Sequence, residues 1–309
     1  MRVVVTGGAG FIGTNVCRAF VDAGHDVVAL DDLSTGRKEN LDALSSVSLV
    51  EGSILDRALL DDVLAGAGAV VHLAARGSVP RSIDDPMATH TANATGTLEV
   101  LEAARRNGSP HVVVASSSSV YGANPKLPRV EDDLLVPVSP YAVSKVATEQ
   151  YALSHQRVFG VPVLAFRFFN VFGPHQPAGH AYAAVVPAFV EAAMAGRPLP
   201  FQGDGTQTRD FTFVATVAEV IVDAVERRVA SPTPVNLAFG TRVSLLELAD
   251  LLEGVLGHPV ERAFGPPRAG DVRDSQADQA RLRSLFPDVE PVPLEDGLRA
   301  TVDWWRATA

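Results

Sequence analysis

Several features that mark particular classes of protein are scarce in this sequence, and each scarcity excludes a class. Cys17 is the one cysteine among 309 residues, so no internal disulfide can form, and we expect a reducing compartment, the cytoplasm. No apolar run reaches the length of a membrane span. An apolar strand pattern begins at residue 2, so we also expect no signal peptide.

Positive charge is also scarce. Lys and Arg number 26 against 36 Asp and Glu, which gives a formal net charge of −10. This balance argues against nucleic acid and anionic membrane surfaces as partners. An anionic small molecule would therefore need a locally basic site. Hydrophobic residues form 47% of the chain, which is enough for the core of a globular enzyme.

A glycine turn follows the first apolar run. Gly7, Gly10 and Gly13 have the GxxGxxG spacing and lie between a strand pattern and a helical pattern. Glycines so placed allow a tight turn and let backbone N–H groups at a helix N-terminus approach a pyrophosphate. The turn therefore predicts dinucleotide binding, with contacts from Phe11 and Ile12 as well.

An acidic pair ends the second apolar run. Asp31 and Asp32 lie about 20 residues after the glycines, where a carboxylate binds the adenosine ribose hydroxyls of a dinucleotide. The same charge repels a 2′-phosphate, so the pair favours NAD over NADP. Arg37 and Lys38 lie close by and moderate this preference.

Short apolar runs alternate with helical patterns through the first 240 residues. This rhythm predicts an α/β fold with a doubly wound parallel sheet of the Rossmann type, and a cofactor at the carboxyl ends of its strands. The predicted strands cover residues 3–6, 27–30, 47–51, 69–73, 111–116, 161–167 and 235–238.

The composition of the chain changes after Asn170, where proline and glycine become more frequent. Residues 214–229 are predicted to form a helix that packs back on the sheet. We therefore expect a second, smaller α+β substrate domain that is discontinuous in sequence. The predicted NAD-binding domain is 1–170 and 213–240, and the predicted nucleotide-sugar-binding domain is 171–212 and 241–309.

Tyr141 and Lys145 lie in Ser-Pro-Tyr-Ala-Val-Ser-Lys, at the start of a predicted helix. Residues four apart on a helix share one face. An ammonium beside a phenol favours the phenolate and lowers the tyrosine pKa from its usual value of about 10. A phenolate near neutral pH can take a proton from a sugar hydroxyl. The pair therefore indicates general base catalysis on an alcohol.

Together with further motifs, these features make the chain resemble an extended short-chain dehydrogenase/reductase, and within that group the nucleotide-sugar 4-epimerases. The resemblance runs nearly end to end. The motifs that carry it, beside those above, are His72-Leu-Ala-Ala75, Ser78-Val-Pro80, Asn93-Ala-Thr-Gly96, Ser116-Ser-Ser-Ser-Val-Tyr-Gly122, Arg167-Phe-Phe-Asn-Val-Phe-Gly-Pro174, Gly203-Asp-Gly-Thr-Gln-Thr-Arg-Asp-Phe211 and Arg268-Ala-Gly-Asp271.

The resemblance implies a set of site residues and no metal. Catalysis would rest on Ser117, Tyr141 and Lys145, with Ser118 an alternative to Ser117 beside the reacting hydroxyl. Further NAD contacts would come from Ser53, Ile54, Leu73, Ala74, Ala75, Asn93, Ser116, Tyr141, Lys145 and Phe168. A UDP-sugar substrate would be held by Ser78, Arg81, Ser117, Ser118, Tyr141, Asn170, Phe201, Arg209, Arg268 and Asp271. For Phe201, stacking near the uracil and core packing both stay open.

The resemblance also bears on the reaction class. Sugar 4,6-dehydratases of this group carry Asp-Glu, and uronate decarboxylases a glutamate, where this chain has Ser118-Ser119. Neither serine can supply the acid and base of an elimination. The expected reaction is therefore epimerisation at C4 through a transient 4-keto sugar. A nucleotide-sugar dehydratase or decarboxylase, and a non-catalytic NAD-binding sensor, are the competing interpretations.

The identity of the sugar stays open. Arg81 lies in a loop that contacts the hexose in relatives, and His175, Gln176 and His180 lie in a second loop. Their cationic and polar side chains suit the C6 carboxylate of UDP-glucuronate. A plain surface position suits them equally well, and the substrate would then be a neutral sugar, UDP-glucose or UDP-N-acetylglucosamine. Relatives also pair the helices near residues 85–106 and 141–160 across a four-helix bundle, so a homodimer is expected.

Overall fold

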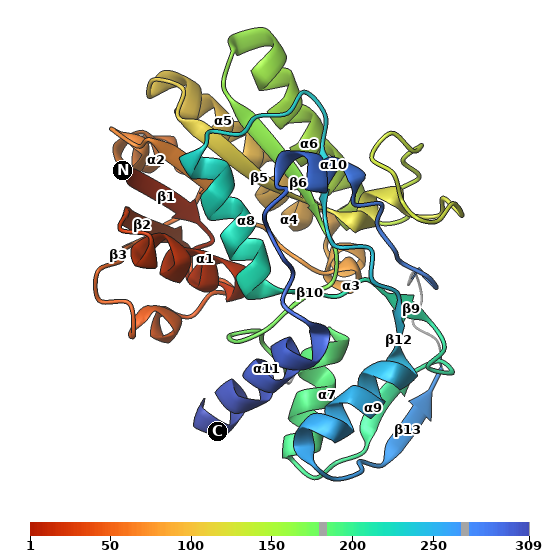
Figure 1. The fold of residues 1–309 in the computed structure, drawn as a ribbon. Helices are drawn as coiled ribbons and strands as arrows, with labels where there is room; N and C mark the ends of the chain where they lie inside the picture. Colours follow the sequence, from red (N-terminus) through yellow and green to blue (C-terminus); the bar gives the residue numbers. More distant parts are fainter. Residues whose placement is uncertain (179–183, 267–271, 309) are drawn as a thin grey trace.

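The computed structural model describes residues 1–178, 184–266 and 272–308 (Figure 1). Its strands are β1 (Arg2–Thr6), β2 (Asp26–Asp31), β3 (Ser48–Glu51), β4 (Ala69–His72), β5 (His111–Ser117), β6 (Val163–Phe168), β7 (Val171–Phe172), β8 (Leu199–Gln202), β9 (Thr208–Arg209), β10 (Thr212–Phe213), β11 (Val235–Leu237), β12 (Val243–Ser244) and β13 (Arg262–Gly265).

The α-helices are α1 (Phe11–Asp22), α2 (Arg57–Leu64), α3 (Val79–Asp84), α4 (Pro86–His90), α5 (Gly96–Arg106), α6 (Pro140–Phe159), α7 (Val185–Met194), α8 (Val214–Glu226), α9 (Leu245–Leu256), α10 (Ala280–Leu285) and α11 (Leu294–Thr308). Short turns of other helix types are η1 (Lys38–Leu41), η2 (Thr91–Thr95) and η3 (Ser118–Tyr121). Within the described residues, no helix is both long and apolar enough to cross a membrane.

Seven parallel strands form the central sheet in the order β11-β6-β5-β4-β1-β2-β3. Their buried, β-branched sequences fit a sheet that is covered on both faces. The predicted α/β fold and all seven predicted strands are confirmed. The sixth strand starts at Val163 and not at Val161, because Pro162 has no N–H to donate to the ladder.

Helices cover both faces of this sheet. One face packs against α1 and α8, through a core that includes Phe20, Phe166 and Ile221. The opposite face packs against α2, α5 and α6, as Figure 1 also shows. The chain moves from β1 to β2 and β3 on one side and then crosses to β4 on the other. The carboxyl ends of β1 and β4 therefore form the switch point where open α/β sheets bind ligands.

A second lobe lies beside this edge of the sheet (Figure 1). It contains α7, α9 and α11 with the strand pairs β8–β13 and β9–β12. Its helices enclose a separate core around Phe189, Leu248 and Leu298. The α8 helix, which packs on the sheet, separates its two parts in sequence.

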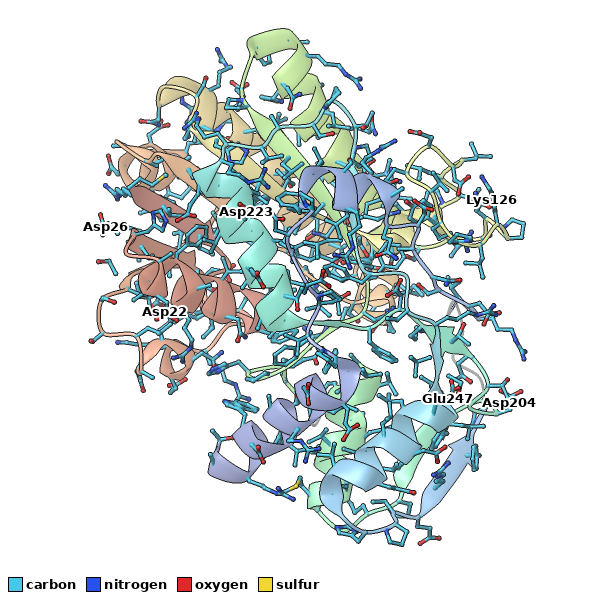
Figure 2. All side chains as sticks on the ribbon, in the orientation of Figure 1. Asp22, Asp26, Lys126, Asp204, Asp223 and Glu247 are labelled. Carbon is cyan, nitrogen blue, oxygen red and sulfur yellow. The ribbon has the colours of Figure 1, made fainter. Side chains whose placement is uncertain are left out.

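Charged side chains lie on the outer faces of both lobes. Figure 2 labels Asp22, Asp26, Lys126, Asp204, Asp223 and Glu247 there. These charged groups are therefore in contact with solvent and do not take part in either core.

Candidate active site

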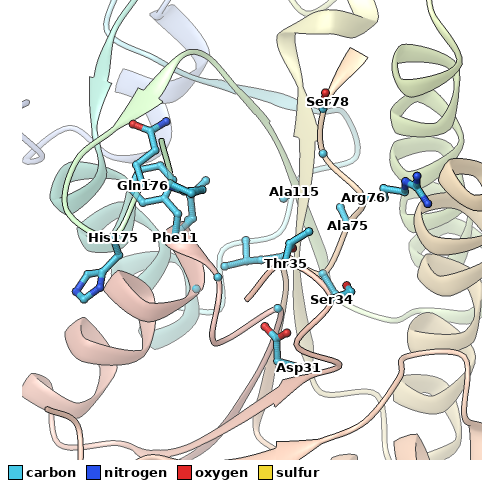
Figure 3. Close-up of a pocket in the computed structure, with 18 of the residues that line it drawn as sticks. Phe11, Asp31, Ser34, Thr35, Ala75, Arg76, Ser78, Ala115, His175 and Gln176 are labelled. Atoms are coloured by element: carbon cyan, nitrogen blue, oxygen red, sulfur yellow. The ribbon is translucent and has the colours of Figure 1, made fainter. Parts of the chain in front are cut away.

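A cavity of about 1710 Å³ runs along the carboxyl edge of the sheet to the second lobe. In Figure 3, Phe11, His175 and Gln176 lie on one side and Ala75, Arg76 and Ser78 on the other. Twenty of the predicted site residues line this cavity: Gly7, Gly10, Phe11, Ile12, Gly13, Asp31, Asp32, Ser53, Ile54, Leu73, Ala74, Ala75, Ser78, Arg81, Ser116, Ser117, Tyr141, Lys145, Phe168 and Asn170.

Four predicted site residues lie in described parts of the chain but do not line this cavity. Asn93 is buried behind its wall, where its side chain binds both the N–H and the carbonyl of Arg76. Ser118 begins the η3 turn. Phe201 is 1% exposed and packs against Phe189 in the core of the second lobe, with ring centroids 4.8 Å apart.

Arg209 is the fourth. It is 9% exposed, and its Nη1 donates to the carbonyls of Thr208 and Arg273. Arg268 and Asp271, together with His180, lie outside the described residues.

The glycine turn brings backbone unusually close to backbone. Gly7 has φ of +70°, and a Cβ there would lie 2.8 Å from the Ala74 nitrogen. A Cβ on Gly13 would lie 2.0 Å from the Gly7 carbonyl oxygen. The α1 helix that follows starts at Gly10 without a side-chain cap. Its first N–H groups are thus open to the cavity side, and they fit the pyrophosphate of a dinucleotide.

The Asp31 carboxylate ends β2 next to this turn. It accepts hydrogen bonds from the N–H groups of Ala9 and Leu33, both at 2.9 Å. Burial raises the pKa of Asp31, and the bonds from Leu33 and Ala9 partly offset that rise. A Cβ on Gly36 would lie 2.7 Å from the carboxylate, so a glycine is needed where the loop backbone passes this close to Asp31. Asp32, beside it, accepts from the Ser34 hydroxyl at 2.5 Å.

The α6 helix positions Tyr141 and Lys145. The Ser139 hydroxyl caps the helix by accepting from the Ala142 N–H at 3.2 Å, and Pro140 occupies the first turn, where a missing N–H costs nothing. Tyr141 therefore lies in the first turn and Lys145 one turn later. Both side chains reach the cavity edge at the end of β5.

Three side chains meet at that point. Burial raises the pKa of Tyr141, and a hydrogen bond with the Ser117 hydroxyl only partly offsets that rise. The Lys145 Nζ lies 6.0 Å from the Tyr141 ring centroid and donates to the Ala115 carbonyl at 2.8 Å. Burial lowers the pKa of Lys145 to about 8. The sequence predicted that Lys145 lowers the tyrosine pKa; in the structure, burial of the Tyr141 ring is the largest influence on that pKa and raises it.

A buried ion pair supports the end of β5 from behind. The Arg167 guanidinium binds both oxygens of Glu149, at 2.8 and 2.7 Å, and its Nη1 donates to the Tyr121 hydroxyl at 2.9 Å. The Ser116 hydroxyl donates to the same Glu149 carboxylate at 3.1 Å. Since Ser116 precedes Ser117 and Glu149 follows Lys145 by one turn, this network joins the β5 strand and the α6 helix, which carry Ser117, Tyr141 and Lys145.

A second buried network lies under the cofactor wall. The His72 ring contacts the hydroxyls of Thr6 at 2.7 Å and Thr97 at 3.0 Å. Burial, and the charge of Lys145 in second place, lower the pKa of His72 to about 3, so the ring is neutral. The Thr6 hydroxyl also accepts from the Ala74 N–H at 3.3 Å. His72 thus holds the cofactor wall and does not itself line the cavity.

Several residues that the sequence did not single out also line the cavity. Arg76 follows the His72–Ala75 motif directly, so extending that motif by one residue would have found it. Thr35 lies in the loop after Asp32. Trp304 and Trp305, in the last helix, border the outer end, where the Trp304 ring lies 5.1 Å from that of His175. No local pattern could have indicated that contact, because it joins segments about 130 residues apart in sequence.

Comparisons with known proteins agree with this geometry. Residues 3–238 match the NAD dependent epimerase/dehydratase family. A UDP-glucose 4-epimerase of Mycolicibacterium smegmatis is 40% identical over 316 residues, which cover 99% of each chain. A UDP-N-acetylglucosamine 4-epimerase from Methanobrevibacter ruminantium, solved with UDP-N-acetylmuramic acid, has a TM-score of 0.94 at 34% identity, covering 100% of this chain and 99% of that one.

Two further solved structures bear on the chemistry. The UDP-glucuronic acid 4-epimerase from Bacillus cereus, in complex with UDP-glucuronic acid and NAD, has a TM-score of 0.89 at 29% identity over 100% of both chains. An NAD dependent NDP-hexosamine 5,6-dehydratase of tunicamycin biosynthesis has a TM-score of 0.89 at 34% identity, covering 99% and 98%. From the extent of these matches, the chain belongs to the NAD dependent epimerase/dehydratase family.

Proposed function

We propose that the protein is an NAD-dependent 4-epimerase of a UDP-sugar. The observation that carries this proposal is one cavity that joins the glycine turn, the Asp31 carboxylate and the group of Ser117, Tyr141 and Lys145. A dinucleotide on the turn would extend toward these three side chains. The relatives that are UDP-sugar 4-epimerases match over nearly their whole length, which supports the same reaction here.

Each catalytic side chain has a role in this proposal. Bound NAD would supply a reversible acceptor for the hydride at C4 of the sugar. Tyr141 takes the proton of the 4-hydroxyl and later returns it, and Ser117 relays or orients that proton. Lys145 keeps a positive charge at the site below a pH of about 8, since burial brings its pKa to that value. The positive charge stabilises the phenolate form of Tyr141, against the effect of burial.

The substrate phosphates and uridine are assigned to the second lobe. Asn170 lines the cavity and is placed to contact the diphosphate. Arg209 and Arg268 would bind its oxygens, since guanidinium groups suit bidentate phosphate binding. Asp271 would accept from the uridine ribose, and Phe201 would act from the core behind the base.

The sugar would be read by the walls nearest Tyr141. Arg81 and Arg76 both line the cavity, and Arg76 is 3.6 Å from Asp85, whereas the Arg81 guanidinium has no hydrogen bond or ion pair with another residue in the described ranges. An unpaired cation at the wall suits the C6 carboxylate of UDP-glucuronate. UDP-glucose and UDP-N-acetylglucosamine stay as the neutral alternatives.

A nucleotide-sugar dehydratase is the second candidate, because one similar structure has that activity. Ser118 and Ser119 speak against it, since neither can act as the acid or base of an elimination. Ser118 and Ser119 also speak against a decarboxylase. The presence of Ser117, Tyr141 and Lys145 speaks against a non-catalytic NAD-binding sensor, which would not need them.

We also propose the two-domain division at 1–170 with 213–240 and at 171–212 with 241–309, which the separate core of the second lobe supports.

A homodimer is supported by exposed apolar side chains along α4 and α6: Met87 is 72%, Val143 54% and Val158 70% exposed. Changing Val158 to Asp should then produce monomers in light scattering, while a wild-type monomer would overturn the dimer. The lone buried Cys17 suits the cytoplasm.

The function is tested by incubating the purified protein with UDP-glucuronate, UDP-glucose and UDP-N-acetylglucosamine. Proton NMR should show the C4 epimer of at least one sugar without net consumption of NAD. A product that has lost water, either a 5,6-unsaturated or a 4-keto-6-deoxy sugar, would support the dehydratase. Loss of CO₂ would support the decarboxylase, and no conversion of any sugar would support the sensor.

A further inference from the structure

A second cavity of about 460 Å³ lies in the segment that joins Ser117 to Tyr141. One wall is formed by residues 122–125, Leu127, Arg129 and Val138, and the other by residues 272–274. Within the described ranges, it shares no lining residue with the large cavity. It is therefore a separate site, although Gly122 and Val138 place it near both ends of the catalytic segment.

The unusual residue in this wall is Arg129. Its side chain is nearly enclosed, with 5% of the residue exposed. The guanidinium makes no hydrogen bond or ion pair with any atom of the described chain, and its Nη1 is fully buried without an acceptor. Its one polar contact is with the ring of Tyr121, whose centroid lies 5.8 Å from Cζ. A buried guanidinium without hydrogen-bond acceptors is costly, so a partner is expected.

The backbone holds Arg129 in this place. Its N–H donates to the Gln276 carbonyl, and its carbonyl accepts from the Asp278 N–H, both at 2.8 Å. The Asn236 side chain donates to the same carbonyl at 2.9 Å. These bonds hold the main chain of Arg129 from two sides, so its side chain is kept at the wall of the cavity.

Nearby acids do not neutralise Arg129. The two Asp133 oxygens are taken by the Lys126 ammonium at 2.6 Å and by the Val130 N–H at 2.8 Å. Asp274, in the opposite wall, accepts from the Thr208 hydroxyl at 2.6 Å. Burial lowers the pKa of Arg129, with Asp133 only partly offsetting that effect. Among the described residues, this wall therefore supplies no acceptor for the N–H groups of Arg129.

We propose that the second cavity binds a small organic anion, with a carboxylate or phosphate monoester on Arg129 and a compact apolar body against Leu127, Val138 and Val272. A guanidinium is the side chain best suited to such oxyanions, because two of its N–H groups can bind two oxygens at once. The apolar lining supplies contact area for the body of the ligand. The volume of about 460 Å³ lies in the range of small-molecule sites and is well below the 1710 Å³ of the large cavity.

The test uses benzoate and phenyl phosphate as probes, which share one apolar body and differ in the anion. The enzyme is first saturated with NAD and UDP, so that the large cavity is occupied. Saturation-transfer NMR should show saturable binding of at least one probe to the wild type. In Arg129→Gln, the affinity should fall at least about tenfold, as expected for loss of a charge-assisted bidentate contact.

Two further variants make the outcome decisive. Lys126→Gln removes one positive charge from the same loop but does not line the cavity, so its affinity should stay within about twofold of the wild type. Ala123→Trp fills the cavity from an exposed position without altering Arg129, and should abolish binding even if Arg129→Gln does not fold. Absence of saturable binding to the wild type, undiminished binding to Ala123→Trp, or equal losses in the Arg129 and Lys126 variants would each overturn the proposal.

Discussion

The two ends of the large cavity are built from different kinds of group. At the cofactor end, backbone atoms and short contiguous motifs form the walls, as at Gly7 to Gly13, and buried networks behind them fix the side chains. At the substrate end, single side chains come from separate segments, such as Arg81 from α3 and His175 from the loop after β7, and they have few partners. In the proposed function, the chemistry and the cofactor therefore depend on rigid elements, while recognition of the sugar depends on single side chains that can be replaced one at a time.

The largest expected effect concerns the group where the two ends meet. Tyr141→Phe should lower kcat by about 10²- to 10⁴-fold, because the general base is lost while the shape of the site is kept. Binding of NAD and the UDP-sugar should be unchanged by calorimetry. Tyr151→Phe, at an exposed position on the same helix, is the matched control and should keep full turnover. Turnover near the wild-type value in Tyr141→Phe would refute the assigned role.

The support behind the cofactor end is tested by the stability of the protein. Arg167→Met should destabilise the fold by about 3–5 kcal/mol, because the buried Glu149 carboxylate loses its partner. Arg227→Met removes the exposed pair with Asp223 and should cost at most about 1 kcal/mol. Urea unfolding of both variants measures the difference. Equal, small losses would mean that the buried pair does not hold the strand and helix together.

Cofactor choice is the next effect in size. Asp31→Ala should weaken NAD about 10- to 100-fold and narrow its advantage over NADP, since a charged acceptor of the ribose hydroxyls is removed. Asp26→Ala, at the exposed start of the same strand, should leave NAD affinity unchanged. Fluorescence titration with both dinucleotides checks this. Purified wild-type protein that carries NADP would contradict the claim that Asp31 binds the ribose hydroxyls and repels a 2′-phosphate.

The smallest effect is expected at the substrate end. Arg81→Ala should lower kcat/KM for UDP-glucuronate about three- to tenfold, because a half-buried cation loses its carboxylate partner. The same variant should change kcat/KM for UDP-glucose less than about twofold, so the neutral sugar serves as the control. Equal losses for both sugars would show that Arg81 supports the loop and does not read charge.

Sequence reasoning succeeded where function is encoded locally. The strands were predictable because buried parallel strands read as short β-branched runs, and the start of α6 because Ser139 and Pro140 form an N-terminal signal before Tyr141. Residues of the glycine turn were found for the same reason. Their spacing alone determines which backbone atoms can approach each other.

The remaining features depend on tertiary packing. The pKa of Tyr141 is raised because the ring is buried, and burial cannot be read from a spacing of four residues. Arg129 looks like an ordinary loop arginine in the sequence; its enclosure follows from contacts with residues near 276. The outer end of the large cavity likewise forms only when Trp304 meets His175.

The central claim is that this cavity carries out epimerisation by moving the C4 hydrogen of a UDP-sugar without exchanging it with water. The most direct measurement is to run the reaction in D₂O with each of the three UDP-sugars and to follow H4 of the product by proton NMR. The account predicts that the C4 epimer forms and keeps its H4 proton in full. Deuterium at C4 of the product, or conversion of the sugar to anything other than its C4 epimer, would contradict it.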